Sequence, residues 1–490
     1  MLHHKIFISL LTSSLLFSGY ALAQEQHKQM MNHKMPEQNN MHMMMQETTL
    51  QEYIKLPTNE PLKPLALVKN TSKKAGVFEA TLTAKPTDVT LATGQSTQFW
   101  LYNDTLLPVI DTQVGTQVNI KLNNQLPQET TIHWHGLSIP ADQDGNPQDP
   151  VAIKQSHMYQ FKLTQNMAGS HWFHPHTHKA TAEQVYRGLA GLFIVRDPND
   201  PLRDIPEQNL FISDLKLDPN GQIAPSSMMD RMNGREGQYT LINGQKQPEI
   251  SLNGTQRWRI WNGNSARYLN LNFPEDQVEA YLVSNDGGLL ETPQAINTIL
   301  LTPGERAEIV LTPKHTGHFN LTALAYDRQK MGNVPPEKDL ILGQVKMQNG
   351  QTITLPKKLR TIADFGTPTV KRQLTYSEEH MNFFINGKEH DMNRIDIHTK
   401  VGQVEEWEIY NNSHMDHNFH LHGTHFLVKE FEQNGQIKKP EYKMLKDTIN
   451  LKPYEKARII TVQNQKGIRM YHCHILEHED AGMMGQLEAK

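Results

Sequence analysis

The chain of 490 residues contains one cysteine, Cys473, which lies directly between two histidines, His472 and His474. A lone cysteine cannot form an internal disulfide. One thiolate, two imidazoles and a weak thioether are the ligands of a blue copper site, and His478 and Met483 lie close by. Because alternate residues of a strand face opposite sides, the segment predicts a copper site on the face of Cys473. The two flanking histidines would bind a second metal on the other face.

Three further clusters of histidines lie elsewhere in the chain. In each His-x-His pair, the spacing places both imidazoles on one face of a strand, where they can bind adjacent metals. His417 lies three residues before His420, so it should face the side that Cys473 uses and complete the blue site. One such pair would be a chance surface pair, but four clusters with consistent facing predict a three-metal cluster between two domains. Its eight histidines are His133, His135, His174, His176, His420, His422, His472 and His474.

These clusters, in this order, resemble those of the multicopper oxidase family, which includes laccases, ascorbate oxidase, bilirubin oxidase and bacterial cuprous oxidases. The resemblance covers nearly the whole mature chain. It is carried by "TIHWHGLSIPADQDGNPQ", "HWFHPHTHKATAEQVYRGLAG", "MDHNFHLHG" and "YHCHILEHEDAGMM". It implies an oxidase with four copper cofactors, one of type 1, one of type 2 and two of type 3. Such an oxidase passes single electrons from a substrate to dioxygen and forms water.

Position by position, the resemblance assigns each ligand to a copper ion. The type 1 copper would be bound by His417, Cys473, His478 and the axial Met483. The type 2 copper would be bound by His133 and His420. One type 3 copper would be bound by His135, His174 and His474, and the other by His176, His422 and His472, with the division of these six between the ions left open. The chain departs from the family at Asn418, where proline usually follows the first type 1 histidine.

Two carboxylates fall where the family places its proton-delivering acids, because the reduction of dioxygen to water also consumes protons. Glu479 directly follows a type 1 ligand, and Asp144 lies eleven residues after His133. Without the resemblance, Asp144 and Gly145 would be interpreted as a turn and Glu479 as a solvated acid. The resemblance therefore implies catalytic roles for Glu479 and Asp144 in proton delivery and for Cys473 in electron transfer.

The reducing substrate is left open by the sequence. Met415, two residues before His417, is placed as in cuprous oxidases that bind Cu(I), and His414, Asp416 and Met484 are further candidates. Oxidation of Cu(I) in copper tolerance is the favoured interpretation. Oxidation of phenols or aromatic amines, as in laccases, is the alternative. A periplasmic copper-binding or storage protein ranks lower, because storage does not require histidines arranged for a cluster.

Two internal repeats indicate the architecture. A glycine-led strand motif begins at Gly115, Gly254 and Gly402, and "LTPGERAEIVL" is repeated as "LKPYEKARIIT". Alternating apolar residues and dense Gly, Pro and Asn predict strands with one buried face. With the resemblance, they predict an all-β fold of three consecutive cupredoxin-like Greek-key β-sandwich domains. The expected domains are a first with cluster ligands, a second that acts as a spacer, and a third with type 1 and cluster ligands, at 47–198, 199–352 and 353–490.

The N-terminus predicts export from the cytoplasm. Residues 1–23 combine Lys5, a short apolar stretch and Ala21-Leu22-Ala23, which is typical of a cleavable signal peptide. No twin arginine is present, so we expect general secretion to a bacterial periplasm. Residues 24–46, with seven methionines and three histidines, should be disordered. They are either soft ligands for Cu(I) or an inert tail.

The remaining composition limits the partners. A net charge of -4 gives no reason to expect nucleic acid. No later apolar stretch predicts a membrane span. The expected partners are dioxygen and either Cu(I) or a small phenolic or aromatic reductant, and the expected oligomeric state is a monomer.

Overall fold

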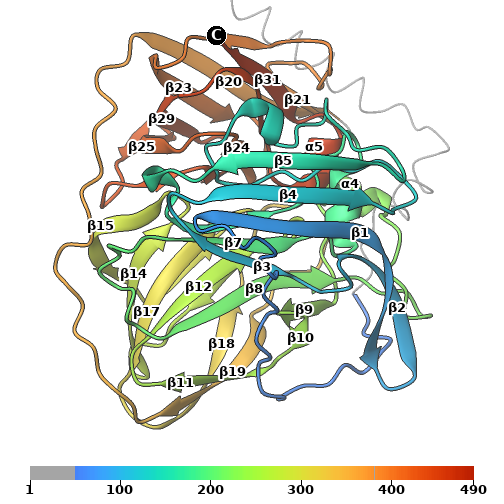
Figure 1. The fold of residues 1–490 in the computed structure, drawn as a ribbon, viewed down its shortest axis with the longest axis vertical. Coiled ribbons are helices and arrows are strands. Elements are labelled where there is room, and N and C mark those ends of the chain that lie inside the picture. The colour runs from blue at the N-terminus through green and yellow to red at the C-terminus, as the bar shows by residue number, and fades with distance from the viewer. Residues whose placement is uncertain (1–49, 380) are drawn as a thin grey trace, which may run out of the picture. The chain divides into compact units, whose positions relative to one another are not determined.

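The computed structural model describes residues 50–379 and 381–490 (Figure 1). The predicted signal peptide and the methionine-rich segment lie outside these residues. Nearly all described residues belong to one compact unit, Thr49–Met331 and Pro335–Lys490. Strands make up 47% of the structure and helices 5%, so the prediction of an all-β fold is confirmed. No helix among the described residues is long and apolar enough to cross a membrane.

The first of three groups of sheets carries two of the histidine clusters. Its elements are β1 (Val77–Ala92), β2 (Gln95–Tyr102), β3 (Val109–Gln113), β4 (Gln117–Asn124), η1 (Ala141–Gln143), β5 (Ser156–Lys162), η2 (Gln165–Met167), β6 (Gly169–Phe173), α3 (Thr181–Tyr186) and β7 (Gly191–Arg196). A four-stranded sheet has the order β2-β1-β4-β5, and a three-stranded sheet has the order β3-β7-β6. Ile120 and Leu122 are buried, as their alternation predicts, and pack in one core with Trp134.

The second group of sheets contains none of the predicted ligands. Its elements are β8 (Glu207–Leu215), α4 (Met228–Asn233), β9 (Tyr239–Ile242), β10 (Gln245–Lys246), β11 (Glu249–Asn253), β12 (Gln256–Asn262), β13 (Leu269–Asn272), β14 (Val278–Asn285), β15 (Gly288–Ala295), β16 (Thr298–Leu301), β17 (Arg306–Pro313), β18 (Gly317–Leu324) and β19 (Leu340–Gln348). A seven-stranded sheet has the order β10-β9-β8-β12-β17-β14-β15, and a five-stranded sheet has the order β11-β19-β18-β13-β16. The inner faces of both sheets share one apolar core that includes Trp258.

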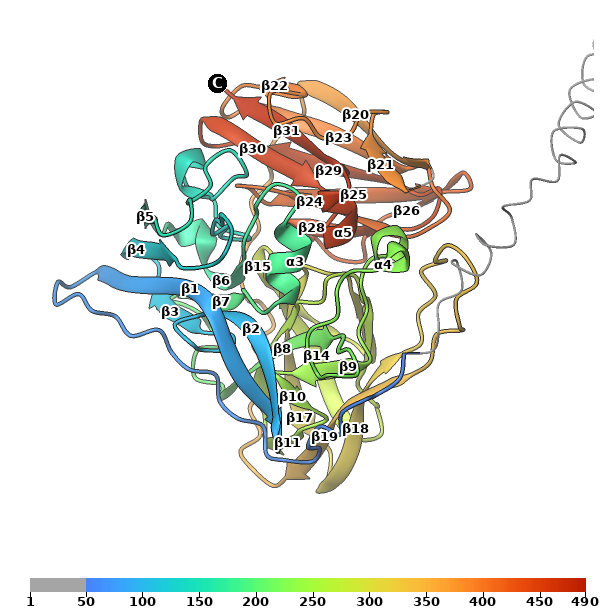
Figure 2. The same ribbon diagram turned by 90° about the vertical axis from the view of Figure 1, so that its right-hand side faces the viewer.

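The third group of sheets holds the cysteine. Its elements are β20 (Val370–Glu379), β21 (Asn382–Ile385), β22 (Ile397–Thr399), β23 (Val404–Asn411), β24 (His417–Leu421), β25 (Phe426–Gln433), β26 (Gln436–Lys438), β27 (Leu445–Lys446), β28 (Thr448–Leu451), β29 (Lys456–Val462), β30 (Gly467–His472), α5 (Leu476–Asp480) and β31 (Met484–Ala489). One sheet has the order β21-β20-β23-β29-β25-β26, with β27 paired to β25, and the other has the order β22-β31-β30-β24-β28. The short helix α5 lies against α3 and α4 (Figure 2).

The two sequence repeats occupy equivalent strand positions. Each glycine-led strand, β4, β12 or β23, pairs in parallel with the first long strand of its group, β1, β8 or β20. In the second and third groups, the strand of the other repeat, β17 or β29, pairs with it antiparallel. Each repeat therefore forms the strand at the same position of a sheet in each group that contains it.

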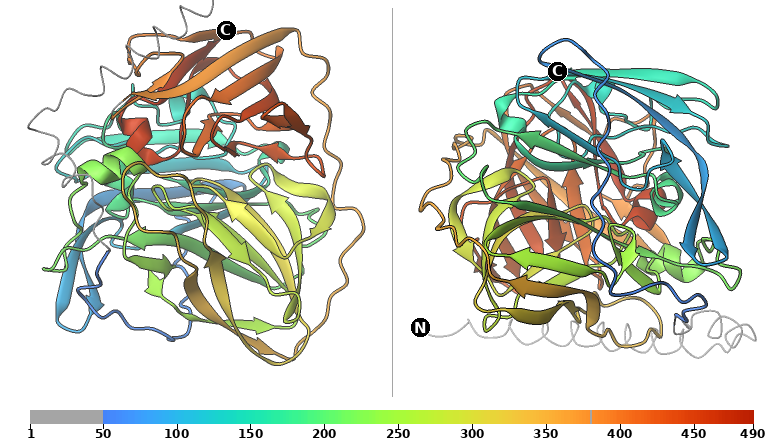
Figure 3. Two further views of the ribbon diagram at one scale, coloured as in Figure 1. Left: turned by 180° about the vertical axis from the view of Figure 1, so that it is seen from behind. Right: turned by 60° about the horizontal axis from the view of Figure 1, so that its bottom comes forward.

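The predicted domain divisions near 198 and 352 lie in the connections between these groups. The first connection joins β7 to β8, and the second joins β19 to β20. The second connection runs extended along the outside of the second and third groups (Figure 3). The three-domain division itself stays a prediction.

A tight turn beside His133 generates a stability prediction. Gly145 has a φ of +68°, and a Cβ atom there would lie 2.0 Å from the carbonyl oxygen of Ile132. Gly145→Ala must therefore move backbone, in addition to the left-handed penalty of about 1–2 kcal/mol. We expect it to lower the free energy of unfolding by more than about 2 kcal/mol, measured by thermal denaturation. The control is Gly402→Ala, where φ is +77° but space is open; an equal loss there would contradict the steric argument.

Candidate metal centre

Strand pairing joins the four histidine clusters into two pairs, one in the third group of sheets and one in the first. β24 pairs antiparallel with β30, and His420 lies opposite His472 in their register. In the first group of sheets, His133 and His174 are joined by an isolated bridge. The two pairs then meet across the boundary between groups, where the ring centroids of His133 and His420 lie 5.8 Å apart. Residues separated by almost 300 positions in sequence thus surround one space.

Three of the eight buried histidines converge through their Nε2 atoms. His176 Nε2 and His422 Nε2 each lie 3.1 Å from His472 Nε2. The potential ligand atoms of all three lie within 4.8 Å of one another. These are the residues predicted to share one type 3 copper.

The other five histidines surround the same space: His133, His135, His174, His420 and His474. The potential ligand atoms of His133, His135 and His174 lie within 4.8 Å of one another. The ring of His474 lies beside them, with its centroid 5.0 Å from that of His135 and 5.4 Å from that of His174. The structure thus brings all eight predicted histidines together.

Unpartnered ring nitrogens show that these histidines fit a metal. The Nδ1 atoms of His133, His174 and His420 lie 3.2, 2.8 and 2.9 Å from backbone carbonyl oxygens. Their Nε2 atoms have no hydrogen-bond partner among the described residues. His135 is reversed, with Nε2 lying 3.2 Å from the Asp447 carboxylate and Nδ1 unpartnered. Because buried polar atoms without partners are costly, and imidazole suits copper, the cluster is a fitting copper site.

The protonation of the cluster histidines agrees with metal binding. Burial lowers the pKa of six of them well below the usual range, and neighbouring groups contribute. The six are His135, His174, His176, His420, His422 and His474. They are therefore neutral at pH 7, and neutral imidazole is the form that ligates metals.

A second site lies on the other face of the His472–His474 segment. Cys473 Sγ lies 3.6 Å from His417 Nδ1 and 4.0 Å from His478 Nδ1, and these two nitrogens are 3.2 Å apart. Met483 is completely buried, and its carbonyl oxygen accepts a 3.0 Å hydrogen bond from the Cys473 N–H. Burial raises the pKa of the Cys473 thiol to about 12, so its thiolate requires a bound cation. Three of the four predicted type 1 residues thus converge.

An ion pair that sequence reasoning missed supports the histidine cluster. Asp447, completely buried, lies against His135 and accepts hydrogen bonds of 2.8 and 2.7 Å from Arg306. Arg306 comes from the second group of sheets, which supplies none of the eight cluster histidines. The only sequence signal is positional, because Arg306 lies in one copy of the "LTPGERAEIVL" repeat and Asp447 lies just before the other.

The predicted acid Asp144 lies between two cluster histidines. Its carboxylate lies 3.2 Å from His133 Nδ1, 3.3 Å from His422 Nδ1 and 3.0 Å from Arg469 Nη1. Burial raises the pKa of Asp144, but His133 and Arg469 lower it by more, so the net pKa lies below the usual value. An ionised Asp144 carboxylate in this position can orient both imidazoles, and its predicted role in proton delivery stays a prediction.

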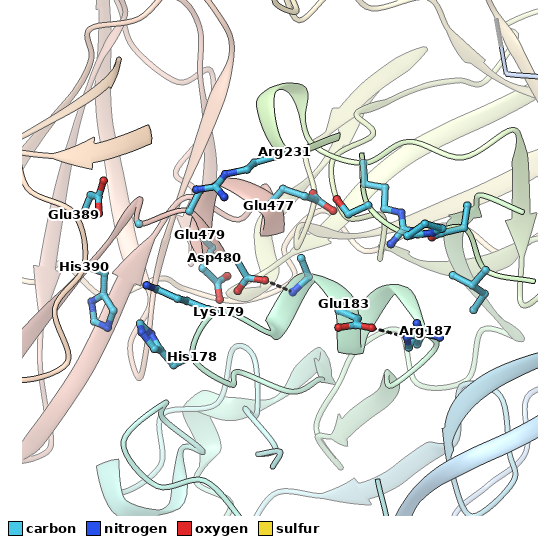
Figure 4. A pocket seen from close by; sticks show the side chains of 18 residues that line it. His178, Lys179, Glu183, Arg187, Arg231, Glu389, His390, Glu477, Glu479 and Asp480 are labelled. Atoms are coloured by element: carbon cyan, nitrogen blue, oxygen red, sulfur yellow. Dashed lines mark hydrogen bonds and ion pairs between the residues drawn. The ribbon is translucent and has the colours of Figure 1, made fainter. Parts of the chain in front are cut away.

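The predicted acid Glu479 connects the cluster to a cavity. Its Oε2 lies 3.1 Å from His472 Nδ1. Glu479 also lines a cavity of about 510 Å³ together with Glu477 and Asp480 (Figure 4). Burial raises the pKa of Glu477 to about 7 and that of Asp480 well above its usual value. Carboxyl groups that hold protons near neutral pH thus line the same cavity as Glu479, which contacts the cluster.

The outer edge of the second site carries a His–Glu pair, of which the sequence predicted His414 as a candidate but missed Glu378. Glu378 Oε1 lies 2.5 Å from His414 Nδ1, and Glu378 Oε2 lies 3.6 Å from His417 Nε2. The His414 side chain is 47% exposed. Met415, in contrast, is completely buried, so an ion in solvent cannot reach its thioether in this conformation. Its role as a substrate ligand stays a prediction.

Two family models and several relatives and solved structures indicate one family. Models described as multicopper oxidase match residues 83–200 and 364–490. A multicopper oxidase of Staphylococcus aureus is 35% identical over 79% of this chain and 83% of its own length. The structure of a multicopper oxidase from Campylobacter jejuni, described as a metallo-oxidase, is 40% identical with a TM-score of 0.87, covering 90% of this chain and 97% of that one. A laccase structure from Pediococcus acidilactici is 30% identical with a TM-score of 0.79, covering 89% and 95%.

The two faces of the His472–His474 segment can be tested separately. Cys473→Ser removes the only thiolate, so the copper-loaded protein should lose its blue absorption, because that colour comes from a thiolate bond to Cu(II). The histidine cluster should still bind copper, measured as copper per chain by mass spectrometry. The companion variant His474→Ala should lose copper from the histidine cluster and retain the blue colour. A blue Cys473→Ser protein would refute the assignment of the cysteine.

Proposed function

This chain belongs to the multicopper oxidase family, and we propose that it oxidises Cu(I) in the periplasm and reduces dioxygen to water. One observation carries the proposal: eight buried histidines, seven of them with a ring nitrogen that has no hydrogen-bond partner among the described residues, lie behind the segment whose other face presents Cys473, His417 and His478. Sites for electron entry and for dioxygen reduction are thus one residue apart. Copper bound there would supply the one-electron transfers and the reduction of dioxygen.

We assign four copper ions to these residues, as the family implies. The type 1 ion is held by His417, Cys473, His478 and Met483, and the type 2 ion by His133 and His420. One type 3 ion is held by His176, His422 and His472, and the other by His135, His174 and His474. The direct peptide link between Cys473 and both flanking histidines gives electrons a short covalent route between the faces.

Protons are delivered, in this proposal, by Glu479. Its carboxylate contacts His472 on one side and the 510 Å³ cavity on the other, so it can exchange protons between the cavity and the cluster. Asp144 is not among the residues that line this cavity. Its ion pair with Arg469 favours a role in orienting His133 and His422.

Glu479→Gln tests this route because it retains size and hydrogen bonding but cannot deliver a proton. We expect normal copper content and normal reduction of the type 1 site, with reoxidation by dioxygen at least about tenfold slower in stopped-flow traces. The control is Glu183→Gln, because Glu183 lines the same cavity but pairs with Arg187 at 2.9 Å. Unchanged reoxidation in Glu479→Gln would rule out the route.

A metal ion as reductant is supported by the outer edge of the type 1 site. The Glu378 carboxylate and the half-exposed His414 lie beside His417, so a cation bound by this pair would lie next to a type 1 ligand. The description of the Campylobacter jejuni relative as a metallo-oxidase points the same way. Residues 24–46 would add soft Cu(I) ligands on a separate segment, which lies outside the described residues. The similarity to a laccase keeps phenol oxidation as the alternative.

The substrate proposal is tested by Glu378→Gln. Loss of the carboxylate charge should reduce Cu(I) oxidation by about tenfold at low copper, because a charge-assisted contact contributes about 1.5–3 kcal/mol. Oxidation of a neutral phenol should change little. Dioxygen uptake measures both, with Cu(I) supplied in a weak chelator.

The matched control is Glu488→Gln. Glu488 forms a similar surface pair with His398 in the same group of sheets, at 3.1 Å, and lies away from the proposed ligands. If Glu378→Gln slowed both substrates equally, the pair would have a structural role. If it slowed neither, Cu(I) would enter elsewhere or would not be the substrate.

A further inference from the structure

Asn418 occupies the position directly after His417 where the family usually has proline, and its side chain is completely buried. Its Oδ1 accepts a 2.6 Å hydrogen bond from the His474 N–H and lies 3.3 Å from Cys473 Sγ. One amide oxygen therefore contacts the sulfur of one metal site and the backbone of a histidine from the other. A proline side chain could make neither contact.

The opposite end of the Asn418 amide is anchored in the second group of sheets. Its Nδ2 donates a 3.0 Å hydrogen bond to the carbonyl oxygen of Pro303 and a second hydrogen bond to Thr302 Oγ1. Both amide hydrogens and the oxygen are thus used, and turning the amide over would break these contacts. The oxygen is therefore held towards the sulfur.

We propose that Asn418 is a positioning residue that lowers the reduction potential of the type 1 copper; this rests on the proposed copper assignment. A metal-bound cysteine is a thiolate and has no proton to donate to Oδ1. The negative end of the amide dipole then lies beside a sulfur that carries negative charge. Reduction adds a further electron to the same site, so the fixed dipole disfavours the reduced form more than the oxidised form. Hydrogen bonding and polarity around the cysteine sulfur are known to tune such potentials.

The anchoring in the second group of sheets strengthens the effect. A dipole that could rotate would turn its amide hydrogens towards the thiolate and would stabilise the added charge. The contacts to Thr302 and Pro303 prevent this reorientation. The same contacts fix the segment that carries Cys473 and His474 relative to the second group.

The test is a redox titration of the blue absorbance of the copper-loaded protein against a mediator of known potential. Asn418→Ala should raise the equilibrium constant for reduction about tenfold, which is 59 mV for a one-electron couple. Asn418→Pro, which installs the residue usual in the family, should raise it similarly and serves if the alanine variant folds poorly. Because proline also removes the backbone N–H, agreement between the variants attributes the shift to the side chain.

The matched control is Asn124→Ala. Asn124 is equally buried, and its amide donates to the carbonyl oxygens of Gln128 and Val151 at 2.8 and 2.9 Å, in the first group of sheets. Its variant should titrate like the wild type. A wild-type potential in both Asn418 variants, a lowered potential, or an equal rise in Asn124→Ala would overturn the proposal. A wild-type protein that takes up copper but stays colourless would instead refute the type 1 assignment.

Discussion

The pairing of β24 with β30 is the constraint on which both metal sites depend. Because side chains alternate along a strand, a slip of one residue would exchange the faces of the ligands that the slipped strand carries. His420 opposite His472 holds the register on one side of β30, and His472 opposite Met484 holds it on the other, through β31. β30 is thus fixed between two neighbours. This ordinary sheet pairing places sulfur on one face of the following segment and imidazoles on the other.

The second group of sheets contributes more than separation, although it supplies no predicted ligand. Arg306 orients the carboxylate that lies against His135, and Thr302 and Pro303 hold the amide of Asn418. All three lie in the short segment around one copy of the second sequence repeat. The interpretation of this region as a spacer is therefore incomplete, because the segment contacts residues that surround both metal sites.

Sequence periodicity predicts the ligands well because a strand has a fixed alternation. His417 could be separated from His420 by parity alone, and the eight cluster histidines followed from spacing and facing. Asp447 and Glu378 could not be found in this way, because their partners lie in distant segments and no local pattern records such a contact. Periodicity also does not show how far a side chain lies from solvent, so the complete burial of Met415 is seen only in the structure. The all-β fold followed from the repeats, whereas the placement of each repeat beside its parallel neighbour required the sheet topology.

The cluster draws half of its histidines from the first group of sheets and half from the third, and the last two belong to the final nineteen residues of the chain. During synthesis, the early histidines exist long before their partners do. No chain that stops before His474 can assemble the complete set of nitrogens. Full occupancy of the cluster therefore requires that the first and third groups of sheets have both been synthesised, folded and brought together.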